Sequence, residues 1–154
     1  MMSLVLLWLF ILNLGIAFGA GLYEHRIVIS RWITPGPRWN AEAARQDDTG
    51  RRFWAFVTTG PLTLLTVANV IAGWNAEDAV RAWWLAAALA ALADRVLTFA
   101  YFIPTMIRLT RMPDSPQSGA TAVRWLRVNY LRHVLVLAAW LLSLQAFALL
   151  NQHA

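Results

Sequence analysis

The sequence predicts an all-α protein, a four-transmembrane-helix bundle in which successive helices run up, down, up and down within a single membrane domain. The chain is 59% hydrophobic with a mean hydropathy of +0.51, whereas soluble domains average about 45–50% apolar residues. Four apolar stretches reach the length of about 20 residues that a bilayer-spanning helix needs. Their short connections favour antiparallel neighbours. We expect these spans at residues 4–23, 53–73, 80–103 and 122–150 of one domain covering residues 1–154.

The first span is followed by signals that end a helix. Thr34 precedes Pro35, and a residue before proline avoids helical backbone angles, so the helix should run past the membrane to about Trp32. The segment Pro35-Gly36-Pro37 predicts a turn. The span has no basic residue before it and is too long for a signal peptide, which indicates that it is retained.

Prolines also mark the second and third spans. Gly60-Pro61 predicts a kink, which a membrane helix tolerates where a neighbour satisfies the freed carbonyl. Pro104 should weaken the third helix near its end.

Tryptophans near the ends of spans are typical of the membrane interface. We therefore interpret Trp32, Trp39 and Trp54 as interfacial aromatics, with a lid over a site as the alternative.

The distribution of arginine predicts the orientation. The net charge of +5 comes from arginine alone, because the chain has no lysine. Residues 24–52 carry six arginines and residues 104–121 carry two, whereas residues 74–79 carry only Glu77 and Asp78. Basic loops face the cytoplasm, so loops one and three should be cytoplasmic and both termini outside, in a bacterial inner membrane. Because the arginines flank apolar spans, we expect the lipid bilayer and not nucleic acid as the partner.

Three spans bring ionisable groups to a similar depth. Asp94 lies roughly 21 Å along the third helix from its start, and Arg132 and His133 lie roughly 15–17 Å along the fourth. Glu24 and His25 end the first span. Charged groups inside a bilayer are costly and are functional candidates by default. Asp94 and Arg132 could form a buried ion pair that only neutralises both charges, or could take part in a site.

The fourth helix gathers polar side chains on one face. Trp125, Asn129 and Arg132 have the i, i+4, i+7 spacing, and Asn129 and His133 are also one turn apart. On the third helix, Asp94 shares a stripe with Tyr101, while Arg95 lies about 100° away by helical geometry. His133 could equally be a hydrogen-bonded packing residue.

Small residues mark close packing in the first span. Gly15 and Gly19 form a small-xxx-small face, which lets another backbone approach. It could pack inside the bundle or form a homodimer seam. Gly21 lies one turn before His25 and should leave room beside this imidazole for a bulky group. We interpret His153 as part of a tail.

No established motif for metal or phosphate binding is present. The chain lacks cysteine, which excludes disulfides and thiolate metal sites. It also lacks paired histidines at metal-ligand spacing and a phosphate-binding glycine loop. We therefore expect neither a metal nor another cofactor in the leading interpretation.

Two segments resemble a known family. The glycine-rich first span ending Gly21-Leu22-Tyr23-Glu24-His25, together with Trp125-x-x-x-Asn129-x-x-Arg132, resembles the anthrone-oxygenase-like family of small four-helix membrane proteins. Most bacterial members have no known function. The resemblance implies oxidation of a polycyclic phenolic anthrone to an anthraquinone by O₂, without a recognised metal or flavin.

The leading hypothesis is therefore a membrane-embedded, cofactor-independent oxidoreductase or oxygenase acting on a lipophilic polycyclic phenol or quinol. Histidine titrates near neutral pH, so His133 or His25 could act as general base, and an arginine can stabilise an oxyanion. Arg132 and Asn129 would hold the anion, and Asp94 would orient them. The expected substrate-binding residues are Trp125, Tyr101, Tyr23 and Glu24.

Two alternatives stay open. His25 and His133 come from different helices at comparable depth and could be the axial ligands of haem b, or the protein could bind a quinone. The chain could also be a non-enzymatic structural or accessory membrane subunit whose polar cluster serves packing.

Overall fold

Four long helical units make up the chain in the computed structural model, which describes residues 2–34, 36 and 38–152. The first unit comprises α1 (Met2–Tyr23), the π-helical segment η1 (Glu24–Val28) and α2 (Ile29–Trp32). The backbone becomes extended at Ile33, so the helix ends where the pre-proline rule predicted. Pro35 and Pro37, for which a turn was predicted, and His153, interpreted as part of a tail, lie outside the described residues.

A small hairpin and two short helices lead into the second unit. Strands β1 (Ile33–Thr34) and β2 (Arg38–Trp39) pair antiparallel, with Ile33 opposite Trp39. Gly36 lies in the turn with a φ of 90°, a left-handed conformation that glycine adopts without steric cost. The remaining elements are, in chain order, α3 (Ala41–Gln46), α4 (Asp48–Phe53), η2 (Trp54–Thr59), α5 (Gly60–Trp74), α6 (Asp78–Leu97), η3 (Thr98–Phe102), α7 (Ile103–Arg111) and α8 (Pro116–Gln152).

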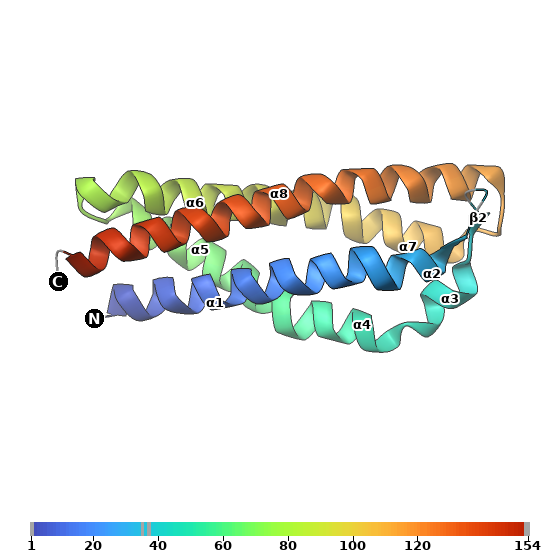
Figure 1. The fold of residues 1–154 in the computed structure, drawn as a ribbon, viewed down its shortest axis with the longest axis horizontal. Helices are drawn as coiled ribbons and strands as arrows, with labels where there is room; N and C mark the ends of the chain where they lie inside the picture. Colours follow the sequence, from blue (N-terminus) through green and yellow to red (C-terminus); the bar gives the residue numbers. More distant parts are fainter. Residues whose placement is uncertain (1, 35, 37, 153–154) are drawn as a thin grey trace.

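The two termini lie at one end of the elongated molecule, and β2, α2, α3 and α7 lie at the other (Figure 1). Four helical stretches are long and apolar enough to cross a membrane: Met2–Trp32, Gly50–Trp74, Asp78–Arg111 and Pro116–Gln152. The predicted all-α class with four long apolar helices is confirmed. The first and third helical units continue several residues beyond the predicted spans, toward the end that carries α2 and α7.

Each of the first three units contains one π-helical segment. The backbone N–H groups of Ile29, Gly60 and Ile103 each donate to the carbonyl five residues earlier. In η2 and η3 a proline follows within two residues of the segment, Pro61 and Pro104. A proline ring clashes with the carbonyl four residues before it, and a wider turn relieves this clash.

The carbonyl left without a backbone donor by Pro61 accepts a hydrogen bond from a side chain of α1. Because Pro61 has no N–H to offer the carbonyl of Val57, that carbonyl needs another donor. Asn13 supplies it, with its Nδ2 lying 3.0 Å from the Val57 oxygen. The prediction that a neighbouring helix satisfies the freed carbonyl is confirmed.

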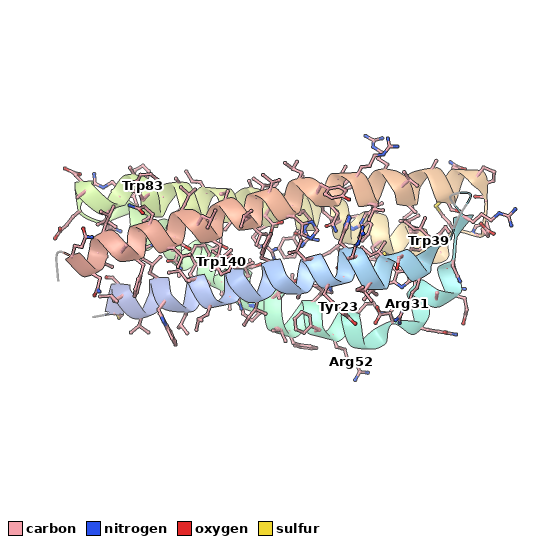
Figure 2. The ribbon with its side chains drawn as sticks, in the orientation of Figure 1. Tyr23, Arg31, Trp39, Arg52, Trp83 and Trp140 are labelled. Atoms are coloured by element: carbon pink, nitrogen blue, oxygen red, sulfur yellow. The ribbon has the colours of Figure 1, made fainter. Side chains whose placement is uncertain are left out.

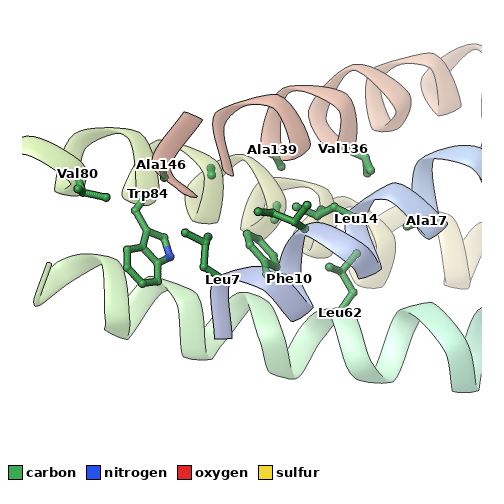
Figure 3. Close-up of a cluster of buried hydrophobic side chains, with 13 residues drawn as sticks. Leu7, Phe10, Leu14, Ala17, Leu62, Val80, Trp84, Val136, Ala139 and Ala146 are labelled. Carbon is green, nitrogen blue, oxygen red and sulfur yellow. The ribbon is translucent and has the colours of Figure 1, made fainter. Parts of the chain in front are cut away.

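Two hydrophobic cores are stacked along the bundle. The first, near the chain ends, includes Leu7, Phe10, Leu14, Leu62, Trp84 and Ala139 (Figure 3). The second, at the opposite end, includes Ile29, Trp32, Trp39, Phe102, Leu109 and Trp125. Between them lies a layer of polar side chains at the level of η1, η2 and η3. The bundle therefore surrounds a polar layer with apolar packing on both sides.

Two tryptophans predicted at the membrane interface belong to the second core. Trp32 is 6% exposed and Trp39 is 2% exposed. Trp39 donates from Nε1 to the Leu109 carbonyl at 2.8 Å. The interfacial interpretation was wrong for these two residues, because the chain after α2 folds back against α7 and α8 and buries them.

Apolar side chains also cover much of the outside of the helices. Large exposed residues include Leu12, Leu64, Ile71, Leu89, Val134 and Leu141. Exposed arginines gather toward the end that carries α2 and α3, where Arg31 lies in the region of Trp39, while Arg52 points outward from α4 (Figure 2). Gly15 packs within the chain, since a Cβ there would lie 3.1 Å from the Trp140 ring, whereas nothing lies within 4 Å of such an atom at Gly19.

Candidate functional site

The polar layer is centred on Asp94, which is completely buried. Its Oδ1 accepts a hydrogen bond from Arg132 Nε at 3.1 Å, across from α6 to α8. Its Oδ2 accepts from both Nε and Nη2 of Arg95. The predicted Asp94–Arg132 ion pair is confirmed, and a second arginine shares the same carboxylate.

Arg95 was not among the predicted site residues. It is 4% exposed, and within the described residues its Nη1 has no hydrogen-bond partner. Helical geometry places its Cα about 100° from Asp94, but the long arginine side chain curls back to the neighbouring carboxylate. The signal was present in the sequence: a second arginine in an apolar span requires a buried partner.

Arg132 is held by contacts on several sides. Its Nη1 lies 3.5 Å from Asn129 Oδ1, which is a weak hydrogen bond. The guanidinium carbon lies 4.7 Å from the centroid of the Phe102 ring and 6.0 Å from that of Trp54, within the range of cation–π attraction. The Asp94 bond and these rings fix the orientation of the guanidinium.

The two histidines of the layer lie in contact. The ring centroids of His25 and His133 are 5.4 Å apart with an edge-on geometry, and His25 Nδ1 lies 3.4 Å from Asn129 Nδ2. His133 Nδ1 lies 2.8 Å from the Asn129 carbonyl oxygen. Since a carbonyl only accepts, Nδ1 carries the proton and Nε2 of a neutral His133 is the acceptor.

The space beside Gly21 is filled by His133. A Cβ at Gly21 would lie 3.0 Å from His133 Nε2. Gly21 therefore leaves room beside His25, and the group that occupies this room is the imidazole of His133 from helix α8.

A cavity of about 330 Å³ lies beside the polar layer, on the side of the second core. Its walls are largely aromatic and aliphatic: Trp32, Trp54, Phe102, Ile103, Met106, Ile107 and Trp125. All three π-helical segments line it, through Glu24 of η1, Trp54 of η2 and Thr98 of η3. Such turns occur often at functional sites, and here they widen the bundle at one level.

Glu24 and Arg132 are the charged groups at the junction of the cavity and the polar layer. Glu24 Oε1 accepts from Trp54 Nε1 at 2.6 Å, and all three side chains also line a second cavity of about 20 Å³. This smaller cavity touches Gly21, Asn129 and His133, and its volume is enough for one water molecule. The two cavities therefore meet at Glu24, Trp54 and Arg132.

The predicted site residues divide into three groups. Those that line the large cavity are Glu24, Trp125 and Arg132. Those that line the small cavity or contact its residues are Asn129, His133, His25 and Asp94. The other two, which belong to neither group, are Tyr23, which is 62% exposed, and Tyr101, which packs edge-on against Phe102.

The positions of His25 and His133 do not suit their predicted role as axial ligands of haem b. Among the described residues, no three His, Asp or Glu side chains gather to hold a metal ion. The imidazoles of His25 and His133 meet edge to face with their centroids 5.4 Å apart, and His133 Nε2 faces Gly21. No gap for a porphyrin separates the rings, so these residues as they lie do not fit haem b.

Comparison with known proteins gave no family model, no curated protein and no solved structure that matches the chain.

Proposed function

We propose that the chain is an integral inner-membrane protein whose four helical units cross the bilayer up, down, up and down. The support is the apolar outer surface of the helices and the exposed arginines at the end opposite to the termini. Because basic segments stay in the cytoplasm, residues 33–49 and 112–115 would lie there and both termini outside. The polar layer would then lie near the inner leaflet.

We further propose that the protein oxidises a flat, lipophilic polycyclic phenol or quinol with O₂. One observation carries this proposal: an aromatic-walled cavity of about 330 Å³ meets the buried polar layer at a carboxylate and a guanidinium, Glu24 and Arg132, while Asp47 and Arg51 line it away from that layer. Ligand cavities are typically about 300–1,000 Å³, mostly apolar, with a few convergent polar groups. This cavity is at the small end of that range, which suits a compact fused-ring molecule.

Glu24 would act as the general base. It lines the large cavity, whereas His133 lines only the small one and His25 lines neither, so a carboxylate takes the role first considered for a histidine. Glu24 would accept a proton from the substrate, and Arg132 would stabilise the oxyanion that results. Asp94 would orient Arg132 through the bond at 3.1 Å.

The overall reaction balances without another reactant. In an anthrone, the ring CH₂ group becomes a carbonyl. One atom of O₂ enters the product, and the other leaves with the two hydrogens as water. The substrate is the reductant and O₂ the oxidant, and an electron-rich anion formed beside Arg132 would be the species that reacts with O₂.

The direct test uses purified protein in lipid nanodiscs with a dihydroxyanthrone as substrate. O₂ uptake and quinone absorbance should rise together, above the autoxidation seen with empty nanodiscs. Glu24→Gln should lower kcat by about 100-fold or more while substrate binding persists, because glutamine still accepts from Trp54. Arg132→Lys should lower kcat similarly, since lysine lacks the planar fork.

Arg124→Ala is the matched control for Arg132, because Arg124 is an exposed arginine on the same helix; it should retain full turnover. Wild-type protein that oxidises the anthrone no faster than empty nanodiscs would refute the proposed activity. If it also fails to bind the anthrone, the role of an accessory subunit becomes the better explanation. An absorption spectrum of protein made with haem available, showing a Soret band, would instead favour the haem alternative.

A further inference from the structure

The large cavity has one wall made of side chains on the outer surface of the bundle. Ala55 of η2 and Ile103 and Ile107 of α7 line it, and all three are exposed, Ile103 by 38% and Ile107 by 48%. The opposite walls are formed by buried residues such as Trp32 and Trp125. The cavity therefore reaches the outside between η2 and α7.

The helices on either side of this opening diverge toward it. At the other end, α5 and α6 are in close contact, since a Cβ at Gly73 would lie 3.3 Å from the backbone nitrogen of Leu85. From there α5 runs obliquely away from α6 toward α4, while α6 continues into α7 (Figure 1). The opening lies on the side where these two helical units have moved apart.

Two hydrogen bonds close the side of the cavity that faces the hairpin and α3. Trp39 donates to the Leu109 carbonyl at 2.8 Å, and Arg45 Nη1 donates to the Thr110 carbonyl at 3.0 Å. Both bonds tie the segment after α2 to α7. A ligand entering from this side would have to break them, whereas the opening between η2 and α7 is bordered mainly by the apolar side chains of Ala55, Ile103 and Ile107. Asp47 and Arg51, in the segment before η2, also line the cavity.

We propose that this opening is a lateral entrance through which the substrate passes from the inner leaflet directly into the cavity. The inference rests on the proposed function and specifies its substrate class: a neutral, membrane-dissolved aromatic molecule, not a water-soluble anion. Phe56, the neighbour of Ala55 in η2, and Phe99, in the segment η3 that leads into α7, are also exposed, and such aromatic side chains are compatible with lipid. The substrate ionises only after entry, where Glu24 and Arg132 receive it.

The absence of cysteine in the chain allows a direct test by single-cysteine labelling. Ala55→Cys and Ile107→Cys proteins in nanodiscs are treated with a lipid-dissolved maleimide and, separately, with a charged water-soluble maleimide. The lipid-dissolved reagent should label both positions at least 10-fold faster. The corresponding dihydroxyanthraquinone, added as a ligand, should slow this labelling several-fold.

Leu64→Cys is the control, because Leu64 is exposed on α5 but does not line the cavity. It should react with the lipid-dissolved reagent and show no protection by the anthraquinone. Faster labelling of positions 55 and 107 by the water-soluble reagent would overturn the proposal, and so would labelling that the anthraquinone leaves unchanged. Positions 55 and 107 could also react slowly with the lipid-dissolved reagent in nanodiscs and faster only in detergent. This result would show that a lipid acyl chain fills the opening, and it would overturn the proposed entrance as well.

A turnover measurement separates this inference from the proposed function. Ile107→Trp should lower kcat/KM for the anthrone by about 10-fold, with most of the change in KM, and Leu64→Trp should change neither kcat nor KM. Wild-type protein without turnover but with anthraquinone protection at positions 55 and 107 would refute only the oxidation. Turnover without such protection would refute only the entrance.

Discussion

Replacing Asp94 by asparagine removes the negative charge at the centre of the polar layer while preserving the shape of the side chain. Asp94 is completely buried and accepts from two guanidinium groups, and one of them, Arg95, is itself 4% exposed. Removing one partner of a buried ion pair costs about 3–5 kcal/mol, because the other charge stays buried without compensation. Arg132 is partly exposed, so most of the cost should come from Arg95.

The free energy of unfolding should therefore fall by about 3–5 kcal/mol in Asp94→Asn. For a chain of this length that corresponds to a decrease in Tm of roughly 6–20 °C. The assay is thermal unfolding in nanodiscs, followed by tryptophan fluorescence. Replacing the whole triad by leucine, Asp94→Leu with Arg95→Leu and Arg132→Leu, should recover most of the stability, since apolar residues can replace a buried ion network.

Asp78→Asn is the matched control on the same helix. Asp78 pairs with Arg81 at 2.9 Å, but its side chain is 91% exposed, and exposed pairs contribute about 0–1 kcal/mol. If Asp94→Asn lowers Tm no more than Asp78→Asn does, the buried triad does not stabilise the bundle and the reasoning fails.

Two further predictions concern packing within the helices. Gly19→Ala should stabilise the protein by up to about 1 kcal/mol through helix propensity, because nothing lies within 4 Å of the added methyl group. Gly15→Ala should lose stability by about 1 kcal/mol or more, since its methyl would press on a tryptophan ring of α8; equal melting temperatures for the two variants would contradict this. Asn13→Ala should cost less in a Pro61→Ala background than in the wild type, by about 1 kcal/mol, because an alanine N–H can then bond the Val57 carbonyl. A double-mutant cycle by thermal unfolding measures this difference, and a coupling energy near zero would refute the assigned role of Asn13.

The polar layer could be predicted because depth in a helix follows directly from residue number. Counting 1.5 Å per residue brought Asp94 and Arg132 to one level, and the structure joins them at 3.1 Å. The end of the first helical unit was predictable as well, since proline restricts the residue before it. Both inferences use backbone geometry, which depends little on the rest of the fold.

The cavity could not be predicted from the sequence. It arises where α5 and α6 diverge and where three helices widen by a π-turn, and neither feature follows from hydrophobic periodicity. Arg95 was missed because an angular position on a helix describes the Cα and not the end of a long side chain. Trp32 and Trp39 were misplaced because a tryptophan in a second core and one in a membrane interface leave the same pattern in the sequence.

The π-helical segments change the direction in which the buried face of a helix points. The buried residues of α8 from Ala122 onward are spaced by three, four or, between Asn129 and Val136, seven residues, which is two helical turns. They are Ala122, Trp125, Asn129, Val136, Ala139, Ser143 and Ala146, so the buried face of this helix keeps one direction along its length. The other three units each gain one residue at the same level, which rotates everything beyond it by about 100°. Deleting a single residue from any of the three segments would restore the continuous phase of that helix. It would also turn the half of the helix beyond the deletion away from its own core, so insertions and deletions there should be far more damaging than substitutions.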